Sequence, residues 1–279
     1  MAISESPKNP VLHQEKVIVQ NKHGETLLGV LHETGSREIV ILCHGFRSTK
    51  EDCIMVNLAV TLEKEGISVF RFDFAGNGES EGSFQFGNYY READDLHAVI
   101  QHFREINRVI NTILGHSKGG DVVLYASKHH DIDNVINVSG CYDLKRDIEE
   151  RIGDNFMQRI EKDGFDDVKN KIGSVVFRVT KESLMDWLTT DMHEACLKIE
   201  KKCGVLTVHG DADEVIPVED AMKFHKIIPN RRLQIVGGAN HGYTSHQAGL
   251  TTIVLNFIKA AVWQWYFESS QRGNQYGIS

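Results

Sequence analysis

The sequence predicts an α/β fold in which helices cover both faces of a mostly parallel, doubly wound sheet. Apolar segments with the length of strands alternate, along most of the chain, with longer segments of helical periodicity. Some of these strand-like segments, such as Glu38–Cys43, are apolar at nearly every position, which is typical of strands buried on both faces. The length of 279 residues suits one large α/β domain or two small ones, and the composition, 41% hydrophobic and 25% charged, excludes a disordered, collagen-like or coiled-coil chain.

Charge and cysteine content narrow the classes of partner. With 31 basic and 39 acidic residues the net charge is −8, so the surface offers no basic footprint for nucleic acid. No apolar run reaches the ~18 residues of a membrane span, and no signal peptide is visible at the start. The five cysteines are irregularly spaced, without a Cys-x-x-Cys pair, so neither a disulfide framework nor a zinc site is expected. We therefore expect a cytoplasmic protein; the sequence does not indicate its oligomeric state.

The first half of the chain predicts a hairpin followed by strand–helix units. Residues 1–14 are polar and are expected to be flexible. The first two strands are joined by Asn21-Lys22-His23-Gly24, whose residues tolerate positive φ, so an antiparallel hairpin is expected. The expected strands are Lys16–Gln20, Thr26–His32, Glu38–Cys43 and Ser68–Phe74, and the expected helices are Asp52–Glu65 and Tyr89–Ile106.

The second half continues the alternation with one interruption. Leu144–Lys202 is rich in charge, helical in pattern and free of a clear strand apart from Ser174–Arg178. Because it falls between two core strands, we interpret residues 144–202 as a cap inserted into a core of residues 15–143 and 203–268, with residues 269–279 flexible. The expected strands are Val109–Leu114, Asn134–Ser139, Val205–His209 and Leu233–Val236, and the expected helices are Gly119–Lys128, Glu219–Ile228 and Ser245–Phe267.

Gly115-His116-Ser117-Lys118-Gly119 follows a predicted strand and opens a predicted helix. This is Gly-x-Ser-x-Gly in the strand–turn–helix context of a nucleophile elbow. The two glycines allow the sharp turn to pack without Cβ clashes, so that Ser117 presents its hydroxyl at the carboxyl end of the sheet. The alternative is a glycine-rich helix start with Ser117 as a cap, and the spacing of a phosphate loop is absent.

A serine nucleophile requires a base. Among the 14 histidines we choose His241, because it follows the last predicted strand in a glycine-rich loop that can reach the elbow. His116 is expected to be its neighbour, and His209 to serve packing or hydrogen bonding. His129 and His130 end a predicted helix, where a solvated role is the default.

The base in turn requires an orienting carboxylate. Asp211 and Asp213 both follow the strand that ends at His209. We choose Asp213, which lies deeper in the loop, and keep Asp211 as its rival, since an Asp at a strand end often caps its own loop.

A tetrahedral oxyanion requires preorganised N–H donors. We expect one from the backbone of Lys118 and the second from Phe46, in the loop His44-Gly45-Phe46-Arg47, where Gly45 permits close approach. The alternative for this loop is a simple connection from strand to helix.

Three other features are interpreted as structural. Phe72–Gly82 is glycine-rich, but Glu81 stands where a dinucleotide fingerprint has its third glycine, so no cofactor is expected. His193-Glu194 lacks the second histidine of a zinc helix, so no metal is expected. Cys43 is expected to be a small buried apolar side chain and not a nucleophile.

Five motifs, in the right order over about residues 15–265, resemble the α/β-hydrolase superfamily. More narrowly, they resemble serine aminopeptidase S33-type hydrolases and the cinnamoyl or feruloyl esterase-like enzymes among them. The segment from His44 to Asp52 also resembles plant members of the group. The motifs are His44-Gly45-Phe46, Phe72–Ser80, Gly115–Gly120, His209-Gly210-x-x-Asp213 and Asn240-His241.

The resemblance implies a serine hydrolase that uses no cofactor and whose insertion lines the substrate pocket. We expect it to cleave a carboxylic ester of a small or aromatic acyl group, with Ser117, His241 and Asp213 as the catalytic residues. The alternatives are hydrolysis of a thioester, lactone or lipid ester by the same triad, or a small-molecule receptor built on the same scaffold. The pocket residues are expected to be His44, Gly45, His116 and Trp187.

Overall fold

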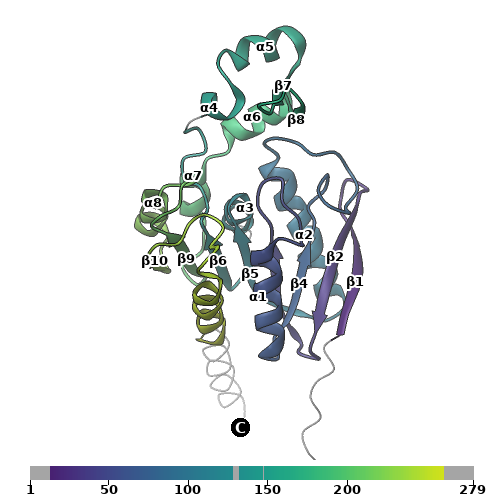
Figure 1. The fold of residues 1–279 in the computed structure, drawn as a ribbon. Coiled ribbons are helices and arrows are strands. Elements are labelled where there is room, and N and C mark those ends of the chain that lie inside the picture. Colours follow the sequence, from purple (N-terminus) through teal and green to yellow (C-terminus); the bar gives the residue numbers. More distant parts are fainter. Residues whose placement is uncertain (1–12, 128–131, 147, 261–279) are drawn as a thin grey trace, which may run out of the picture.

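A twisted eight-stranded sheet forms the centre of the molecule. The computed structural model describes residues 13–127, 132–146 and 148–260. The strands lie in the order β1-β2-β4-β3-β5-β6-β9-β10, with helices on both faces (Figure 1). Their bounds are β1 His13–Gln20, β2 Thr26–Glu33, β3 Glu38–Cys43, β4 Ser68–Phe72, β5 Val109–His116, β6 Asn134–Val138, β9 Gly204–Gly210 and β10 Arg231–Val236.

The pairing confirms a mostly parallel sheet with an antiparallel hairpin at its N-terminal edge. β1 pairs antiparallel with β2 and β2 pairs antiparallel with β4, whereas every other neighbouring pair is parallel. The prediction placed the start of β1 three residues too late. His13 already pairs with Glu33, although the residues before Lys16 are polar, because backbone pairing does not depend on side-chain hydrophobicity.

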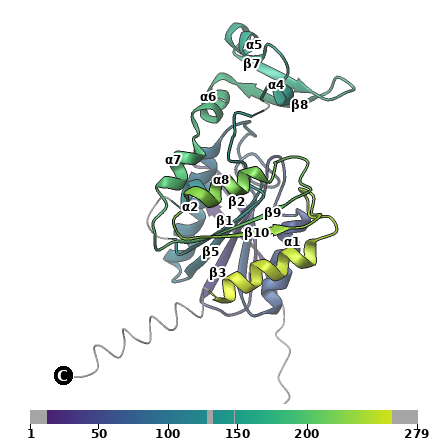
Figure 2. The same cartoon turned by 90° about the vertical axis from the view of Figure 1, so that its left-hand side faces the viewer.

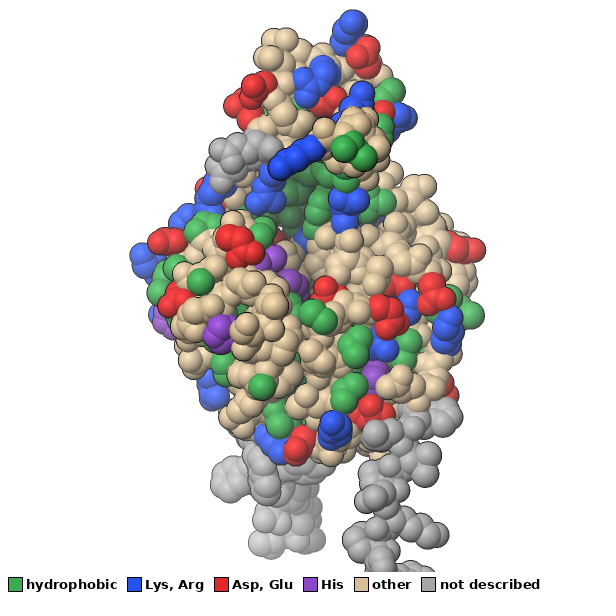
Figure 3. Space-filling view, viewed as in Figure 1, with side chains coloured by type: hydrophobic (Ala, Val, Ile, Leu, Met, Phe, Trp, Pro, Cys, Tyr) green, Lys and Arg blue, Asp and Glu red, His purple; other side chains and the backbone are tan. Residues whose placement is uncertain are grey.

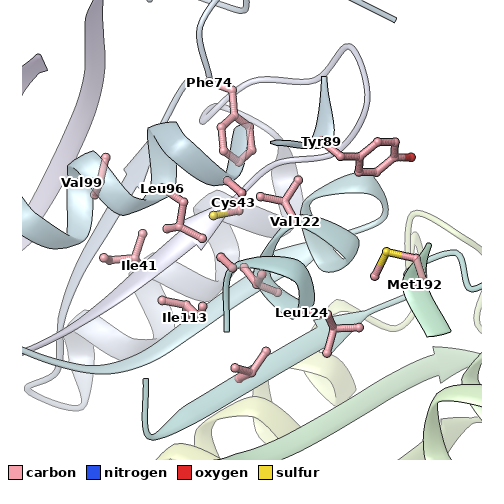
Figure 4. Packing of buried hydrophobic residues seen from close by; sticks show 14 of the residues in the cluster. Ile41, Cys43, Phe74, Tyr89, Leu96, Val99, Ile113, Val122, Leu124 and Met192 are labelled. Atoms are coloured by element: carbon pink, nitrogen blue, oxygen red, sulfur yellow. The ribbon is translucent and has the colours of Figure 1, made fainter. Parts of the chain in front are cut away.

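Alternate residues of the strands point into two hydrophobic cores, one on each face of the sheet. In β3, Ile39, Ile41 and Cys43 face one core, and Val40 and Leu42 face the other. The first core is covered by α2 and α3, whose side chains surround Cys43 in Figure 4, and by α8. The second is covered by α1 and by the helical residues 247–260. The core helices are α1 Cys53–Lys64, α2 Tyr89–Glu105, α3 Lys118–Ala126 and α8 Glu219–Ile227.

Residues 148–197 form a separate group of elements between β6 and β9. Figures 1 and 2 show α4, α5, α6 and the β7–β8 hairpin standing beyond the sheet, while α7 returns beside α8. The elements are α4 Ile148–Ile152, α5 Phe156–Asp163, β7 Phe165–Lys169, β8 Val175–Thr180, α6 Lys181–Thr189 and α7 Met192–Leu197.

The expectation of a single strand in this insertion is wrong, because β8 has an antiparallel partner in β7. The β7 sequence Phe-Asp-Asp-Val-Lys carries two acids and little β-branching, so neither composition nor alternation identifies it. Its pairing is supported by a cross-strand ion pair, in which Arg178 Nε lies 2.7 Å from Asp167 Oδ1.

Within residues 13–127, 132–146 and 148–260, no helix combines the length and the apolar character needed to cross a membrane. The end of the predicted helix Ser245–Phe267 lies outside the described residues, as do His129 and His130. Most of residues 1–14 and all of residues 269–279, the predicted flexible termini, lie outside them as well.

Candidate active site

Ser117 stands on a strained turn between β5 and α3. Its φ of 55° and ψ of −124° are rare for a residue with a side chain, and such strain collects at functional sites. Glycines on either side make the turn possible. A Cβ at Gly119 would lie 2.4 Å from the Cys43 carbonyl oxygen, and one at Gly115 would lie 2.0 Å from the Gly119 carbonyl oxygen. The elbow therefore packs directly against the end of β3.

Ser117, His241 and Asp213 form one hydrogen-bonded chain. Ser117 Oγ lies 3.0 Å from His241 Nε2, and His241 Nδ1 lies 2.9 Å from Asp213 Oδ2. Because a carboxylate only accepts, Nδ1 carries the proton, and Nε2 is left to accept from the serine hydroxyl. The three residues follow β5, β9 and β10, and the carboxyl ends of these parallel strands lie at one edge of the sheet.

Asp213 is held in place by its own loop. Its Oδ1 accepts the backbone N–H groups of Val215, at 2.9 Å, and Ile216, at 2.8 Å. Burial acts to raise the pKa of Asp213, but the hydrogen bonds from His241 and these backbone groups outweigh it and hold the pKa below its ordinary value. The rival Asp211 accepts the Gly238 N–H, at 2.6 Å, and so caps the neighbouring loop instead of orienting His241.

The two other histidines near the triad form hydrogen bonds to backbone carbonyls. His209 Nε2 donates to the Ile216 carbonyl at 2.9 Å and lies 3.4 Å from Asp213 Oδ2. His116 Nε2 donates to the carbonyl of His241 at 2.9 Å. Burial, helped by the nearby His241, lowers the pKa of His116 to about 4, so His116 stays neutral at physiological pH.

The Gly45–Phe46 peptide is oriented by His44. His44 accepts the Phe74 N–H at Nε2, 3.1 Å away, so its proton is on Nδ1 and is donated to the Gly45 carbonyl at 2.8 Å. Burial lowers the pKa of His44 to about 4, which keeps this neutral tautomer. Because C=O and N–H point in opposite directions in a trans peptide, the Phe46 N–H points away from His44.

This peptide lies beside the nucleophile. A Cβ at Gly45 would lie 3.1 Å from Ser117 Cβ, a tight contact that would push the loop or the serine away by a few tenths of an ångström, so glycine favours this close approach. The second expected donor, the Lys118 N–H, lies at the start of α3. Among the described residues, neither the Phe46 nor the Lys118 N–H has a hydrogen-bond acceptor. Both groups are thus free to bind a ligand oxygen next to Ser117.

A comparison with protein families identifies the chain. Residues 34–197, more than half of it, match the family described as serine aminopeptidase, S33. The chain belongs to the serine aminopeptidase S33 family. The fold is therefore that of the α/β-hydrolases, as the sequence predicted.

Two curated relatives of this S33 chain are described as uncharacterised proteins. One is YfhR of Salmonella typhi, 25% identical over 205 residues, which cover 72% of this chain and 65% of that protein. The chain thus spans just under two thirds of that relative's length. The other is YDL057W of Saccharomyces cerevisiae, 21% identical over 235 residues, which cover 74% of this chain and 69% of the relative.

Solved structures with the same fold include esterases. Est1E from Butyrivibrio proteoclasticus, solved with ferulic acid bound, has a TM-score of 0.71 and 22% identity, with 88% of this chain and 99% of that one covered. The Pyrococcus furiosus esterase Pf2001 has a TM-score of 0.70 and 21% identity, over 93% and 95%. The hydrolase GrgF from Penicillium sp. sh18 has a TM-score of 0.74 and 21% identity, over 91% and 99%. At these identities the likeness shows the fold.

One feature of this S33 chain was missed at the sequence level. The Lys118 side chain turns inward, and its Nζ lies 2.6 Å from Glu92 Oε1 of α2, with both side chains buried. The sequence predicts a role only for the backbone N–H of Lys118. A signal was present, because Glu92 falls on the apolar face of the predicted helix between Tyr89 and Leu96, where a charge requires a partner.

The structure places Trp187 at the joint between the insertion and the core. Its indole is 3% exposed and stacks on Phe86, with ring centroids 4.2 Å apart and planes at 10°. The indole N–H donates to the Leu144 carbonyl at 2.6 Å. Trp187 therefore fastens α6 to the core, and its expected contact with substrate stays a prediction.

Phe46 belongs to a cluster of aromatic rings drawn from the core and the insertion. Its ring centroid lies 5.4 Å from that of Phe84, 6.0 Å from Phe86 and 5.5 Å from Phe177 of β8. Phe46, Phe84 and Phe177 are partly exposed. Figure 3 shows a hollow between the insertion and the core, with hydrophobic side chains inside it and histidines at its lower edge. Phe84 and Phe86 were not selected from the sequence, because they lie in a loop without periodicity.

The glycine-rich loop after β4 and Cys43, which we interpreted as structural, lie in this S33 chain as follows. Asp73 is buried and accepts the backbone N–H and the Nζ of Lys50, both at 2.6 Å, which shapes the loop after β4. Burial raises the pKa of the Cys43 thiol, so a thiolate is disfavoured there. Among the described residues, no group of three or more His, Cys, Asp or Glu side chains is arranged to hold a metal ion.

Proposed function

We propose that the protein is a serine hydrolase that cleaves carboxylic esters of small or aromatic acyl groups. One observation carries the proposal: the continuous chain from Ser117 through His241 to Asp213, with two free N–H groups beside the serine. This arrangement contains a nucleophile, a base, an orienting carboxylate and an oxyanion site.

In the first half-reaction, Ser117 Oγ attacks the ester carbonyl while His241 Nε2 takes the hydroxyl proton. The carbonyl oxygen becomes an oxyanion and accepts the N–H groups of Phe46 and Lys118. Collapse of this intermediate breaks the bond to the alcohol oxygen, which receives the proton from His241. Asp213 keeps the proton on Nδ1 and stabilises the imidazolium.

In the second half-reaction a water molecule repeats these steps on the acyl-enzyme. His241 takes a proton from water, the hydroxide attacks the acyl carbonyl, and the acid leaves as Ser117 recovers its proton. The Ser117 proton leaves with the alcohol and is replaced by one from water, so Ser117 and His241 end in their starting protonation states and these steps use no cofactor or metal. Thioesters and lactones can follow the same steps.

Two further observations support this reading. Est1E, which shares the fold, was solved with ferulic acid, an aromatic acid. In this chain the aromatic rings around Phe46 offer an aromatic acyl group surfaces on which to stack. The five cysteines are free, and four of them are buried, which suits our expectation of a reducing, cytoplasmic setting.

The family description favours a second candidate, an aminopeptidase. The same triad chemistry cleaves amides, and an aminopeptidase would in addition bind the free α-amino group of its substrate. An aminoacyl 4-nitroanilide tests this candidate directly, since its hydrolysis releases a coloured amine.

The test combines labelling with a substrate panel. A fluorophosphonate should label the wild-type protein and not Ser117→Ala, and a receptor on this scaffold would not react. The wild type should hydrolyse 4-nitrophenyl acetate and methyl ferulate with a higher kcat/KM than a C16 ester or an aminoacyl anilide. Activity that rises steadily with chain length would indicate a lipase, and a preference for the anilide would indicate a peptidase.

A further inference from the structure

Three rings in the cleft region form a stack that spans the core and the insertion. Phe86 lies nearly parallel to Phe177 of β8, at 8°, and to Trp187 of α6, at 10°. A guanidinium lies over each of the two partner rings. Arg47 Cζ is 5.7 Å from the Phe177 ring centroid, and Arg151 Cζ is 5.8 Å from the Trp187 ring centroid.

Among the described residues, neither of these two arginines forms an ion pair: no carboxylate lies within 4.0 Å of the guanidinium of Arg47 or Arg151, and both side chains are exposed. Each of the other arginines of the insertion forms an ion pair with a nearby carboxylate, as in Arg146–Asp220, Arg159–Asp166 and Arg178–Asp167. The planar forks of Arg47 and Arg151 are therefore free to bind an anion from outside.

Arg47 lies on the loop that contacts the nucleophile elbow. It follows Phe46 directly and stands two residues after Gly45, which touches the elbow. Because consecutive Cα atoms are ~3.8 Å apart, the Arg47 Cα is at most ~8 Å from that of Gly45. Its guanidinium lies over Phe177, whose ring also contacts Phe46 beside the serine.

The charge around the hollow is positive, whereas the chain as a whole is negative. The net charge is −8, so an anion gains nothing from the surface as a whole. In Figure 3, Lys and Arg side chains gather along the upper edge of the hollow, below the insertion. A cleft lined with one sign of charge and with apolar walls concentrates ligands of the opposite sign.

We propose that the substrate is an ester that carries an anionic group, a carboxylate or phosphate, on its aromatic or small acyl or alcohol part. Arg47 binds this anion, and Arg151 adds to the positive field from the side of the insertion. The inference rests on the proposed ester hydrolysis and specifies which esters are preferred.

Two pairs of matched esters test the charge preference. On the acyl side, mono-(4-nitrophenyl) terephthalate is compared with 4-nitrophenyl 4-carbamoylbenzoate. On the alcohol side, 4-acetoxybenzoate is compared with 4-acetoxybenzamide. Each pair differs by a carboxylate against a neutral amide of the same shape. At low salt we expect kcat/KM to be about tenfold higher for the anion in one pair, as a charge-assisted hydrogen bond provides.

Variants assign the preference to residues. Arg47→Gln should abolish most of the anion-to-amide ratio, Arg151→Gln should lower it severalfold, and raising the salt concentration should weaken it in the wild type. Arg178→Gln is the matched control, because this arginine also lies over a ring, Phe165, but is paired with Asp167. Its ratio should stay that of the wild type.

A ratio near one in both pairs, or a ratio that survives both Arg47→Gln and Arg151→Gln, would overturn the inference. Failure of the proposed function looks different, since none of the four esters would then be hydrolysed faster than by Ser117→Ala. In that case titration calorimetry with terephthalate and terephthalamide, each added to Ser117→Ala, still tests whether the anion site exists. Tighter binding of terephthalate that is lost with Arg47→Gln supports the anion site, and equal binding contradicts it.

Discussion

Lys118 and Glu92 form a buried ion pair directly behind the nucleophile, with Lys118 Nζ 2.6 Å from Glu92 Oε1. Lys118 follows Ser117 in the chain, so the pair ties the first residue of α3 to α2. The Lys118 ammonium also lies 5.2 Å from the Tyr89 ring centroid. The helix start that carries the elbow is thus anchored to α2 by an ion pair that is buried away from water.

This pair predicts a stability defect that grows with pH. Burial raises the pKa of Glu92 to about 7, and Lys118 opposes the rise. In Lys118→Met the pKa goes higher, so the folded protein keeps a proton that the unfolded chain, with an ordinary glutamate, has lost. A raised pKa contributes stability below about pH 4.5 that is lost as pH rises through the folded value.

We therefore expect Lys118→Met to lose little free energy of unfolding at pH 5 and ~3–5 kcal/mol, as for a broken buried pair, near pH 8.5. Urea denaturation at several pH values measures this. Lys259→Met is the matched control, because Lys259 pairs with Glu65 at the same 2.6 Å on the surface. Its loss should stay below about 1 kcal/mol. Parallel curves for Lys118→Met and wild type would contradict the prediction.

Removal of the Ser117 hydroxyl should abolish turnover and leave the fold intact. Backbone geometry holds the elbow, and the hydroxyl contributes a single hydrogen bond, to His241. The oxyanion site and binding groups that remain in the variant should still give ~10³–10⁴-fold catalysis over water, so turnover is lost relative to the wild type. Hydrolysis of 4-nitrophenyl acetate by Ser117→Ala, with circular dichroism as the folding control, checks this. Wild-type rates in the variant would rule Ser117 out as the nucleophile.

The two loop aspartates should differ sharply in their effect on catalysis. Asp213→Asn removes the carboxylate that fixes the His241 tautomer, and kcat should fall by about 10⁴. Asp211→Asn alters only the hydrogen bond to the Gly238 N–H, worth about 1 kcal/mol, and kcat should change little. Steady-state kinetics on both variants provide the measurement. The reverse order would make Asp211 the triad acid.

Trp187 should matter for the attachment of the insertion. Trp187→Phe keeps a ring on Phe86 but leaves the Leu144 carbonyl without its donor, which costs ~1–3 kcal/mol, and Trp187→Ala should cost ~3–5 kcal/mol. We also expect Trp187→Ala to slow methyl ferulate hydrolysis more than that of 4-nitrophenyl acetate.

Chemical denaturation and limited proteolysis within residues 148–197 measure this attachment. Met185→Ala on the same helix is the control, since Met185 is 45% exposed and its loss should be small. Equal protease sensitivity of Trp187→Ala and Met185→Ala would show that Trp187 does not fasten the insertion.

The sequence was most informative where local chemistry dictates structure. The apolar run Glu38–Cys43 can only be a buried strand, and the glycines around Ser117 permit a turn that other residues would block. The sequence was least informative where an element or side chain depends on a partner that is remote in the chain. Glu92 stands out as an acid on an apolar helix face, but its partner is a lysine 26 positions away, which no local pattern identifies. The acidic strand β7 is specified by its partner β8 and has no local signature.

The span between Ser117 and His241 has a consequence for how activity arises. The two residues are 124 positions apart, and Asp213 and His241 both come from the last two strands of the sheet. A chain being synthesised therefore carries its elbow long before the histidine that activates it has left the ribosome. Until β9 and β10 add to the sheet, the serine has no base and is chemically inert. Under the proposed mechanism, hydrolysis should therefore return, during refolding from denaturant, only when β9 and β10 have joined the sheet.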